Sequence, residues 1–454
     1  MKRFARLPSI ATVIAGYNNG SLTPVDVADH CIAAVKAQES SMHAWECFDS
    51  QRLMDQAKDA TQKLQSGAAP RALEGLPVGV KDIFNTAGFP TQMGSPLWKD
   101  FTPGNDARVL YDLKRLGAIV PGKTVTAEFA VHSLGKTLNP HAADRTPGTS
   151  SSGSAVAVAT GMVPVALGTQ TAGSIIRPAS FCGVWGCKPS FGLVPRTGML
   201  KTTDSLDSVG FFANHADDLL PVFDAIRVHG RNFPLSDSAL SNTARQAAPQ
   251  QRPWRVAIVK PHVWNHVPAY ADEAFDALCE RLAAHPRFEL VHAALPADMA
   301  NAHAVHETIY NKALAYYFKE EFNRAELISP IMNRLISAGR LVSVAAYEAA
   351  LEEQVGLARL MENFFTGEMH ASTDKAGYDV MLTLSTACEA PLRSAEEAPD
   401  SALMWTLTHL PAVSAPVFSS PDGLPYGLQL VARRYNDPLL FRFISEVEEL
   451  GLFK

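Results

Sequence analysis

Apolar side chains recur at helical spacing in the first part of the chain. Residues 9–66 predict three helices, the first of them capped by Ser9. The second is expected to begin with Thr23 as its cap and Pro24 at the first helical position. The third should extend roughly from residue 49 to residue 64, with charged residues along one face.

Shorter apolar runs alternate with helical patterns farther along. Residues 75–84 are β-like, 106–117 predict an amphipathic helix, and 118–124 predict a strand followed by a turn. Beyond residue 253 the alternation continues, with predicted strands at 254–260, 288–293, 378–385 and 423–432 and predicted helices at 268–285, 298–325, 341–366 and 437–450. Such alternation is typical of an α/β protein.

The sequence shows no repeat period and no convincing linker. Residues 228–253 are rich in Ser, Asn, Gln, Pro and Arg, which predicts an exposed insertion. We therefore expect one large domain over residues 1–454.

Composition narrows the function classes. The chain has 47% hydrophobic and 19% charged residues and a net charge of −6, without a block rich in Lys or Arg. A nucleic-acid partner is therefore not expected. No apolar run is long enough to cross a membrane, and Pro8, Ser9 and Thr12 interrupt the only run resembling a signal peptide. We expect a cytoplasmic protein without a membrane partner.

The spacing of the cysteines and histidines indicates neither a disulfide framework nor a metal site. Six cysteines do not form a disulfide framework in a chain of 454 residues. The pairs His262/His266 and His303/His306 have spacings that could bring two imidazoles together, but neither pair has an obvious third ligand. We therefore expect no metal.

Residues 117–124, GAIVPGKT, match the phosphate-binding pattern GxxxxGK[ST]. A functional loop of this kind follows a strand and opens a helix, so that helix N–H groups face the phosphates. Here a predicted helix precedes the motif, and Ile119 and Val120 give its interior a strand-like character. A nucleotide-binding enzyme stays a distant alternative from another class.

Residues 145–190 combine serine- and glycine-rich turns with apolar runs. Tight turns around Ser150 and Ser174 can expose backbone N–H groups, as an oxyanion site requires. A flexible linker is the usual interpretation of such composition. However, the runs AVAVAT (155–160) and VPVALG (163–168) follow directly and have the character of a buried core. The segment therefore predicts a site built on a scaffold.

A serine nucleophile requires a base, and the GxSxG pattern of a nucleophile elbow is missing around Ser150. Lys81 is the candidate because it lies in an apolar run, where burial would lower its pKa from the usual value of about 10.4. The alternative is that Lys81 extends to solvent or pairs with Asp82.

Residues 148–190 resemble the signature of the amidase signature family, and similar segments occur at 75–84, 122–130, 411–417 and 423–437. The resemblance covers nearly the whole chain and is most specific from about 75 to 215. It implies an α/β fold with a large mixed β-sheet covered on both faces by helices.

The resemblance also implies a Ser–cis-Ser–Lys triad. Ser174 matches the nucleophile, Ser150 matches the bridging serine next to a cis peptide bond, and Lys81 matches the general base. The oxyanion hole would consist of the backbone N–H groups of Thr171, Ala172, Gly173 and Ser174.

Several positions depart from the common family pattern. Thr149 and Ser152 replace glycines around the bridging serine, Ala172 replaces a glycine in the oxyanion loop, and Gln170 stands where many members have Asp. None of these changes removes a catalytic atom. They predict a narrower pocket and a small substrate, with Thr149 among the substrate-binding residues.

Arg177 lies three residues after Ser174, whereas many family members have an arginine two residues after the nucleophile. The arrangement resembles the malonamidase-like branch, in which this arginine helps to bind a substrate carboxylate. A guanidinium group suits that role because it donates two parallel hydrogen bonds. The alternative is a structural ion pair with an acidic neighbour.

The resemblance implies hydrolysis of a small carboxamide to a carboxylic acid and ammonia or an amine, without a cofactor. Because the base must be deprotonated, kcat/KM should rise towards alkaline pH. A homodimer is also implied.

The first alternative is the glutaminase (A) subunit of a tRNA-dependent amidotransferase, which works with partner chains. A non-catalytic relative is a further alternative, against which the presence of Lys81, Ser150 and Ser174 argues. The physiological amide stays open.

Overall fold

A mixed β-sheet runs through the computed structural model, which describes residues 4–368 and 377–453. Its described strands are β1 (Trp45–Phe48), β2 (Val78–Lys81), β3 (Gly122–Thr124), β4 (Val165–Gln170), β5 (Trp185–Lys188), β6 (Ser208–Ala213), β7 (Trp254–Ile258), β8 (Phe288–His292), β9 (Val380–Leu384), β10 (Ala412–Ser419) and β11 (Pro425–Ala432). Their spatial order is β1-β3-β2-β4-β6-β5-β10-β11-β9-β7-β8.

Parallel and antiparallel pairs share this sheet. Strand β2 is parallel to both β3 and β4, with Val80 opposite Lys123 on one side and Leu167 on the other. From β4 to β9 the neighbouring strands are antiparallel, and β9, β7 and β8 are again parallel. The mixed sheet that the family resemblance implied is therefore confirmed.

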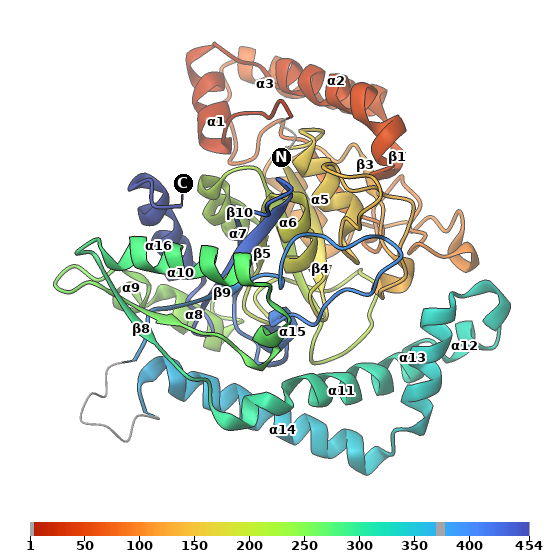
Figure 1. Ribbon diagram of the computed structural model, residues 1–454. Helices are drawn as coiled ribbons and strands as arrows, with labels where there is room; N and C mark the ends of the chain where they lie inside the picture. The colour runs from red at the N-terminus through yellow and green to blue at the C-terminus, as the bar shows by residue number, and fades with distance from the viewer. Residues whose placement is uncertain (1–3, 369–376, 454) are drawn as a thin grey trace.

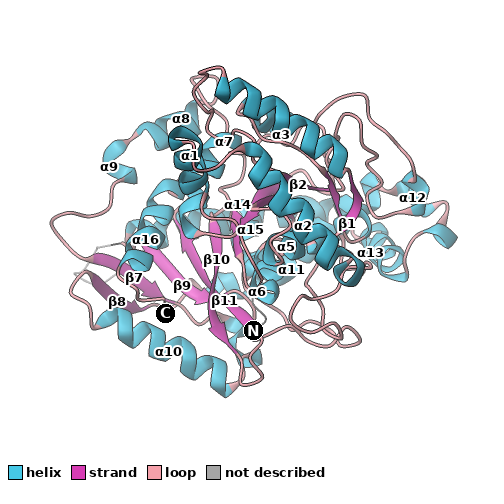
Figure 2. Cartoon of the chain, turned by 90° about the horizontal axis from the view of Figure 1, so that it is seen from above, coloured by secondary structure: helices cyan, strands magenta, loops and turns pink. Residues whose placement is uncertain are grey.

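Helices cover both faces of the sheet (Figures 1 and 2). Apolar residues of one sheet face pack with α5 (Ser152–Ala159), α6 (Ile176–Cys182), α11 (Ala302–Tyr317), α14 (Val344–Thr366) and α15 (Ala402–Leu407). The other face packs against α4 (Arg108–Arg115), α7 (Leu219–Ile226), α10 (Ala269–Ala283) and α16 (Asp437–Glu449). Alternate residues of a strand point to opposite faces, so two separate apolar layers result.

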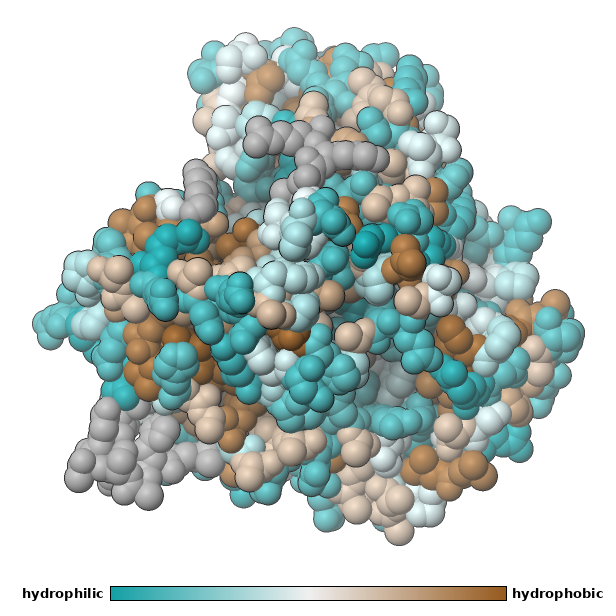
Figure 3. All heavy atoms as spheres, viewed as in Figure 1, coloured by the Kyte–Doolittle hydropathy of each residue, from teal (hydrophilic) through white to brown (hydrophobic). Residues whose placement is uncertain are grey.

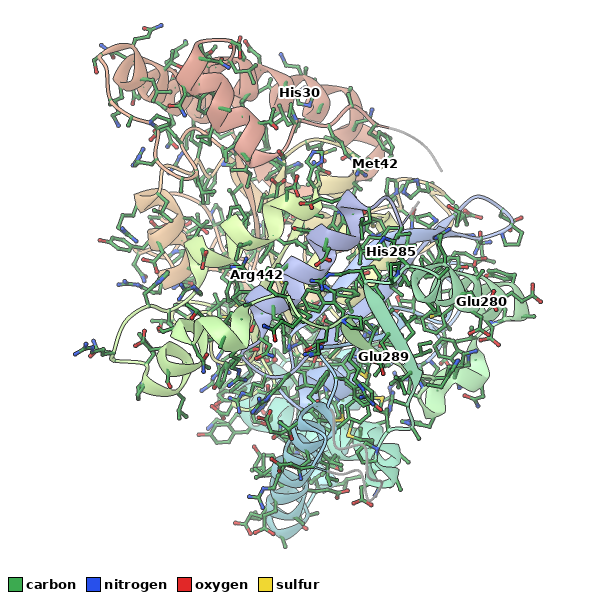
Figure 4. All side chains as sticks on the ribbon, turned by 90° about the vertical axis from the view of Figure 1, so that its left-hand side faces the viewer. His30, Met42, Glu280, His285, Glu289 and Arg442 are labelled. Atoms are coloured by element: carbon green, nitrogen blue, oxygen red, sulfur yellow. The ribbon has the colours of Figure 1, made fainter. Side chains whose placement is uncertain are left out.

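The three N-terminal helices begin where the sequence predicts. They are α1 (Ile10–Asn19), α2 (Pro24–Met42) and α3 (Ser50–Gln65), capped by the side chains of Ser9, Thr23 and Asp49. In Figure 4, His30 and Met42 of α2 lie at the end of the molecule opposite the long helices α11 and α14. The predicted caps Ser9 and Thr23 are confirmed, because each side chain accepts a hydrogen bond from a backbone N–H in the first turn. Asp49 caps the third helix in the same way.

The structure differs from the predicted elements at several places, of which three lie outside the centre of the sheet. Strand β1 separates α2 from α3, although only helices were predicted there. The predicted helix over 298–325 divides at Phe318 into α11 and the short α12 (Lys319–Phe322). An additional helix, α13 (Pro330–Leu341), begins with Ser329 as its cap.

Residues 228–253 are largely exposed, but they are not without structure. They form α8 (Pro234–Ser241) and α9 (Thr243–Gln246), and Ser236, Ala239 and Gln246 are buried. The Gln246 side chain donates hydrogen bonds to the carbonyl groups of Ala239 and Tyr435. The segment is therefore anchored to the C-terminal part of the chain.

One face of the protein is mostly polar (Figure 3), and its cysteines form no disulfide bonds among the described residues. Polar residues cover most of the face seen in Figure 3, with apolar patches between them. None of the helices in the described residues is both long and apolar enough to span a bilayer. All six cysteines, which lie within the described ranges, are free.

Candidate active site

The predicted catalytic residues converge at the carboxyl ends of the neighbouring parallel strands β2 and β4. Lys81 is the last residue of β2, and Thr169 lies near the end of β4. Ser150 precedes α5, and Ser174 lies in the turn between β4 and α6. Crevices outside the carboxyl ends of strands are common ligand sites in α/β proteins.

Lys81 is fully buried and contacts two hydroxyl groups. Its Nζ lies 2.8 Å from Ser150 Oγ and 2.9 Å from Thr169 Oγ1. Burial lowers the pKa of Lys81 well below its ordinary value, and the more distant Asp207 carboxylate opposes this shift only in part. The surroundings therefore favour the neutral amine, which is the form that can accept a proton.

The alternative pairing of Lys81 with Asp82 is not what the structure shows. Asp82 Oδ1 lies 2.9 Å from Lys123 Nζ, and both side chains are buried. Lys123 also donates to the carbonyl group of Phe84 and to Thr91 Oγ1. Among the described residues, Lys81 has no carboxylate within ion-pair distance.

The same contacts bear on the match to a phosphate-binding loop. Its lysine, Lys123, lies inside β3 rather than in a loop before a helix, and its amine is occupied by protein acceptors. Residue Ile119 forms a bridge with Pro77 beside the sheet. This geometry lacks the helix N-terminus on which phosphate binding would depend.

The two predicted catalytic serines are placed differently. The Thr149–Ser150 peptide bond is cis, and the Ser150 carbonyl accepts a hydrogen bond from the Ala127 N–H at 3.0 Å. Ser174 is also buried, but its hydroxyl makes no hydrogen bond to another described residue. The structure thus joins Lys81 to Ser150 and leaves the Ser174 hydroxyl unengaged.

In the turn of residues 171–174, backbone carbonyl groups have hydrogen-bond partners but the backbone N–H groups do not, among the residues that the structure describes. Its carbonyl groups accept hydrogen bonds from outside the turn: Thr171 from His306 Nε2 at 2.8 Å, Ala172 from Thr406 Oγ1 at 2.8 Å, and Gly173 from the Arg177 N–H at 2.9 Å. The four backbone N–H groups of the turn donate to no acceptor in the described part of the chain. Free N–H groups in a buried turn suit the stabilisation of a negatively charged oxygen.

Residues outside the turn hold it in this orientation. Gln170 Oε1 accepts hydrogen bonds from the N–H groups of Ile175 and Ile176, and Asp207 Oδ1 accepts one from Thr171 Oγ1. Burial lowers the pKa of His306 to about 4, so its imidazole is neutral at pH 7. The Nε2–H tautomer is required because the partner of that nitrogen is the carbonyl oxygen of Thr171.

Arg177 is buried beside this turn and pairs with two carboxylates. Its Nε lies 2.8 Å from Asp400 Oδ2 and 3.1 Å from Glu397 Oε2. These carboxylates raise the pKa of Arg177 despite its burial. A structural ion pair, the alternative left open by the sequence, is therefore present, and a substrate carboxylate would have to share Arg177 with it.

The Thr149 hydroxyl lies 3.3 Å from His132 Nδ1, which in turn lies 3.4 Å from an Arg177 nitrogen. Surrounding protein and the Arg177 charge lower the pKa of His132 to about 3, so this imidazole is neutral. Since Nδ1 faces a guanidinium donor, it serves as an acceptor. His132 thus connects the two residues predicted to bind substrate.

Sequence reasoning missed several residues that complete the site, namely Thr169, Asp207, His132, His306 and Thr406. His306 had drawn attention only as half of a possible metal pair with His303. In the structure His303 contacts His262 at 3.1 Å instead, and His306 points to Thr171. Only the three-dimensional neighbourhood distinguishes these roles.

The mixed sheet with helices on both faces defines an α/β protein, and a buried lysine and buried serines lie near its strand ends. A family model described as Amidase matches residues 26–441. The chain therefore belongs to the amidase family, whose members act on carbon–nitrogen bonds.

Relatives and solved structures agree with this membership. The chain is similar to the A subunit of glutamyl-tRNA(Gln) amidotransferase from Nostoc punctiforme, with 29% identity over 94% of each chain. One similar structure belongs to an inhibitor-bound complex that concerns the evolutionary origins of an s-triazine catabolic enzyme, with 25% identity, a TM-score of 0.84 and coverage of 98% of this chain and 99% of the other. The corresponding amidotransferase chain from Thermotoga maritima shares the fold, with 22% identity, a TM-score of 0.76 and coverage of 99% and 96%.

Proposed function

We propose that the protein hydrolyses a small carboxamide through an acyl-enzyme on Ser174. The observation that carries this proposal is the 2.8 Å contact between Ser150 Oγ and the buried Lys81 amine, which has no carboxylate partner among the described residues. Neutral Lys81 accepts the Ser150 proton while Ser150 accepts the Ser174 proton, and Ser174 Oγ attacks the carbonyl carbon.

The carbon–nitrogen bond then breaks, and the proton returns through Ser150 to the leaving nitrogen. Water attacks the acyl-enzyme by the reverse relay and releases the carboxylic acid. The unengaged N–H groups of residues 171–174 would stabilise the oxyanion in both steps, because they require no reorientation during the reaction. Each step uses only side chains, backbone groups and water.

Ammonia release from a panel of amides tests this function. The panel should include small neutral amides, amides with a free carboxylate, and glutamine, with Ser174→Ala as the blank. Release above the blank with at least one amide supports the proposal. No release from any member of a broad panel, by a folded enzyme over several pH values, counts against it.

Activity should rise with pH as Lys81 loses its proton. Because burial lowers the pKa of Lys81 in the folded protein, the midpoint of the rise in kcat/KM should lie well below the ordinary lysine value of about 10.4. A profile from pH 5 to pH 10, with circular dichroism as a control for folding, measures this midpoint. A midpoint at or above the ordinary value, or activity that falls throughout this range, would contradict Lys81 as the base.

Arg177→Leu tests whether this residue anchors a substrate carboxylate. If Arg177 binds such a group, KM should rise about tenfold or more for a carboxylate-bearing amide and much less for its neutral analogue, since hydrogen bonds between charged groups contribute about 1.5–3 kcal/mol. An equal change for both amides would instead assign Arg177 to its ion pair with Asp400 and Glu397. Thermal unfolding should be measured alongside the kinetics, because the variant leaves the buried Asp400 and the half-buried Glu397 without their cation.

The second candidate function is the glutaminase subunit of a tRNA-dependent amidotransferase. It is favoured by the glutamyl-tRNA(Gln) amidotransferase relatives, which are 28–29% identical over more than nine-tenths of this chain. Glutamine hydrolysis that is stimulated by co-purified partner subunits would support it. Glutamine-independent activity in a homodimer or monomer, measured by light scattering, would support the stand-alone amidase.

A further inference from the structure

A cavity lies apart from the contact between Lys81 and Ser150. It has a volume of about 760 Å³ and is enclosed by α8, α9, α14, the turn after α15 and the segment after β11. Its lining includes none of the predicted catalytic residues. The volume falls within the range of about 300–1,000 Å³ that is common for small-molecule sites.

One part of the lining is apolar and open to solvent. Leu235 of α8 is 76% exposed and Val355 of α14 is 60% exposed, and both border the cavity. Leu351, Ala358 and Leu410 extend this surface inward. An apolar ligand that covers this surface removes it from water, which favours binding.

Three arginines line the same cavity, namely Arg245, Arg359 and Arg434. Within the described residues, none of the three forms an ion pair with a carboxylate. Arg245 instead donates to Asn436 Oδ1 at 2.6 Å and to the Arg434 carbonyl, and burial lowers its pKa. The Arg434 Nε is buried without a hydrogen-bond partner in the described part of the chain.

Other titratable groups of the lining do not neutralise these cations. Among the described residues that line the cavity, the only carboxylate belongs to Glu362, and it forms an ion pair with Arg433. His409 is neutral because burial lowers its pKa to about 4, and its Nε2 is engaged by the Ser205 carbonyl. The cavity therefore keeps a surplus of positive charge next to an apolar wall.

We propose that this cavity binds a small organic anion with an apolar body, such as a medium-chain carboxylate. The anionic group would meet the guanidinium groups, with which a carboxylate can form two parallel hydrogen bonds. The hydrocarbon part would cover Leu235, Leu351 and Val355. This proposal is independent of the proposed amidase activity, since it uses none of the residues that the reaction requires.

Calorimetric titration of the full-length protein with octanoate, octan-1-ol and inorganic phosphate tests the proposal. Octanoate should bind with 1:1 saturation and at least tenfold more tightly than either of the other probes. Octanol binding equal to that of octanoate would show an uncharged apolar site and overturn the proposal. Phosphate binding equal to that of octanoate would show a simple anion site, which also overturns it.

Variants locate the bound octanoate, since a carboxylic acid could also bind near Ser174 as a product analogue. Arg359 lies on the exposed surface of α14, so Arg359→Gln should leave the fold intact, and together with Arg434→Gln it should weaken octanoate binding at least tenfold. Arg115→Gln on the exposed surface of α4 is the matched control and should leave binding unchanged. Undiminished binding by a folded Arg359→Gln/Arg434→Gln variant, or no saturable binding by the wild type, would refute the proposal.

Discussion

Ser174→Ala should lower kcat for amide hydrolysis at least ~10³-fold, because the acyl-enzyme can no longer form. Lys81→Met should cause a loss of similar size, because removing one member of a catalytic unit costs about as much as removing several. The double variant should therefore be little worse than either single variant. Ammonia release at saturating substrate, with circular dichroism to confirm folding, measures all three.

Ser152→Ala is the matched control for these variants. Ser152 is buried only two residues from Ser150, but its hydroxyl has no hydrogen-bond partner among the residues that the structure describes. Removing a buried hydroxyl without a partner should cost neither stability nor catalysis. A loss in Ser152→Ala as large as that in Ser174→Ala would mean that the segment is merely sensitive to substitution, and the assignment of Ser174 would fail.

Lys123→Met should destabilise the fold by about 3–5 kcal/mol, the usual cost of leaving a buried charge without its partner. The Asp82 carboxylate would remain buried after the loss of Lys123, and the Phe84 carbonyl and Thr91 hydroxyl would each lose a hydrogen bond. Urea unfolding followed by fluorescence measures the change in the free energy of unfolding. Loss of activity in this variant should follow the unfolded fraction.

Lys136→Met provides the comparison for a surface lysine. Its side chain is 47% exposed and pairs with Glu46 at 3.0 Å, so removal of its charge should cost at most about 1 kcal/mol. If Lys123→Met were equally mild and ATP raised the unfolding temperature of the wild type, the structural role of Lys123 would be wrong. Residues 117–124 would then be better interpreted as a nucleotide-binding loop.

Local patterns predicted those elements that have one exposed face. Helices α2 and α10 alternate polar and apolar residues at helical spacing, and Thr23 and Pro24 mark the start of α2. Strands β7 and β9 appeared as short runs between polar segments. The catalytic roles of Lys81, Ser150 and Ser174 came from the family resemblance, because the motifs around them are specific in residue type and order.

The secondary structure at the centre of the molecule could not be predicted from local patterns of polar and apolar residues. Helix α5 and strand β4 are buried along their whole length and consist mostly of small or β-branched residues. A fully buried helix and a fully buried strand show no amphipathic period, so short apolar runs do not distinguish them. Strand β1 and helix α13 were also missed, since their short runs are stabilised by neighbours distant in sequence.

The types of chemistry available, the order of the motifs and the capped helices follow from local sequence, because they depend on residues that are close along the chain. Which lysine is left without a carboxylate depends on the three-dimensional fold. Asp82 pairs with Lys123, and Lys81 contacts Ser150, which is 69 residues away in sequence. Likewise, Arg177 pairs with Asp400 across 223 residues. Burial and long-range hydrogen bonds set these protonation states and partners, and neither can be read from local spacing.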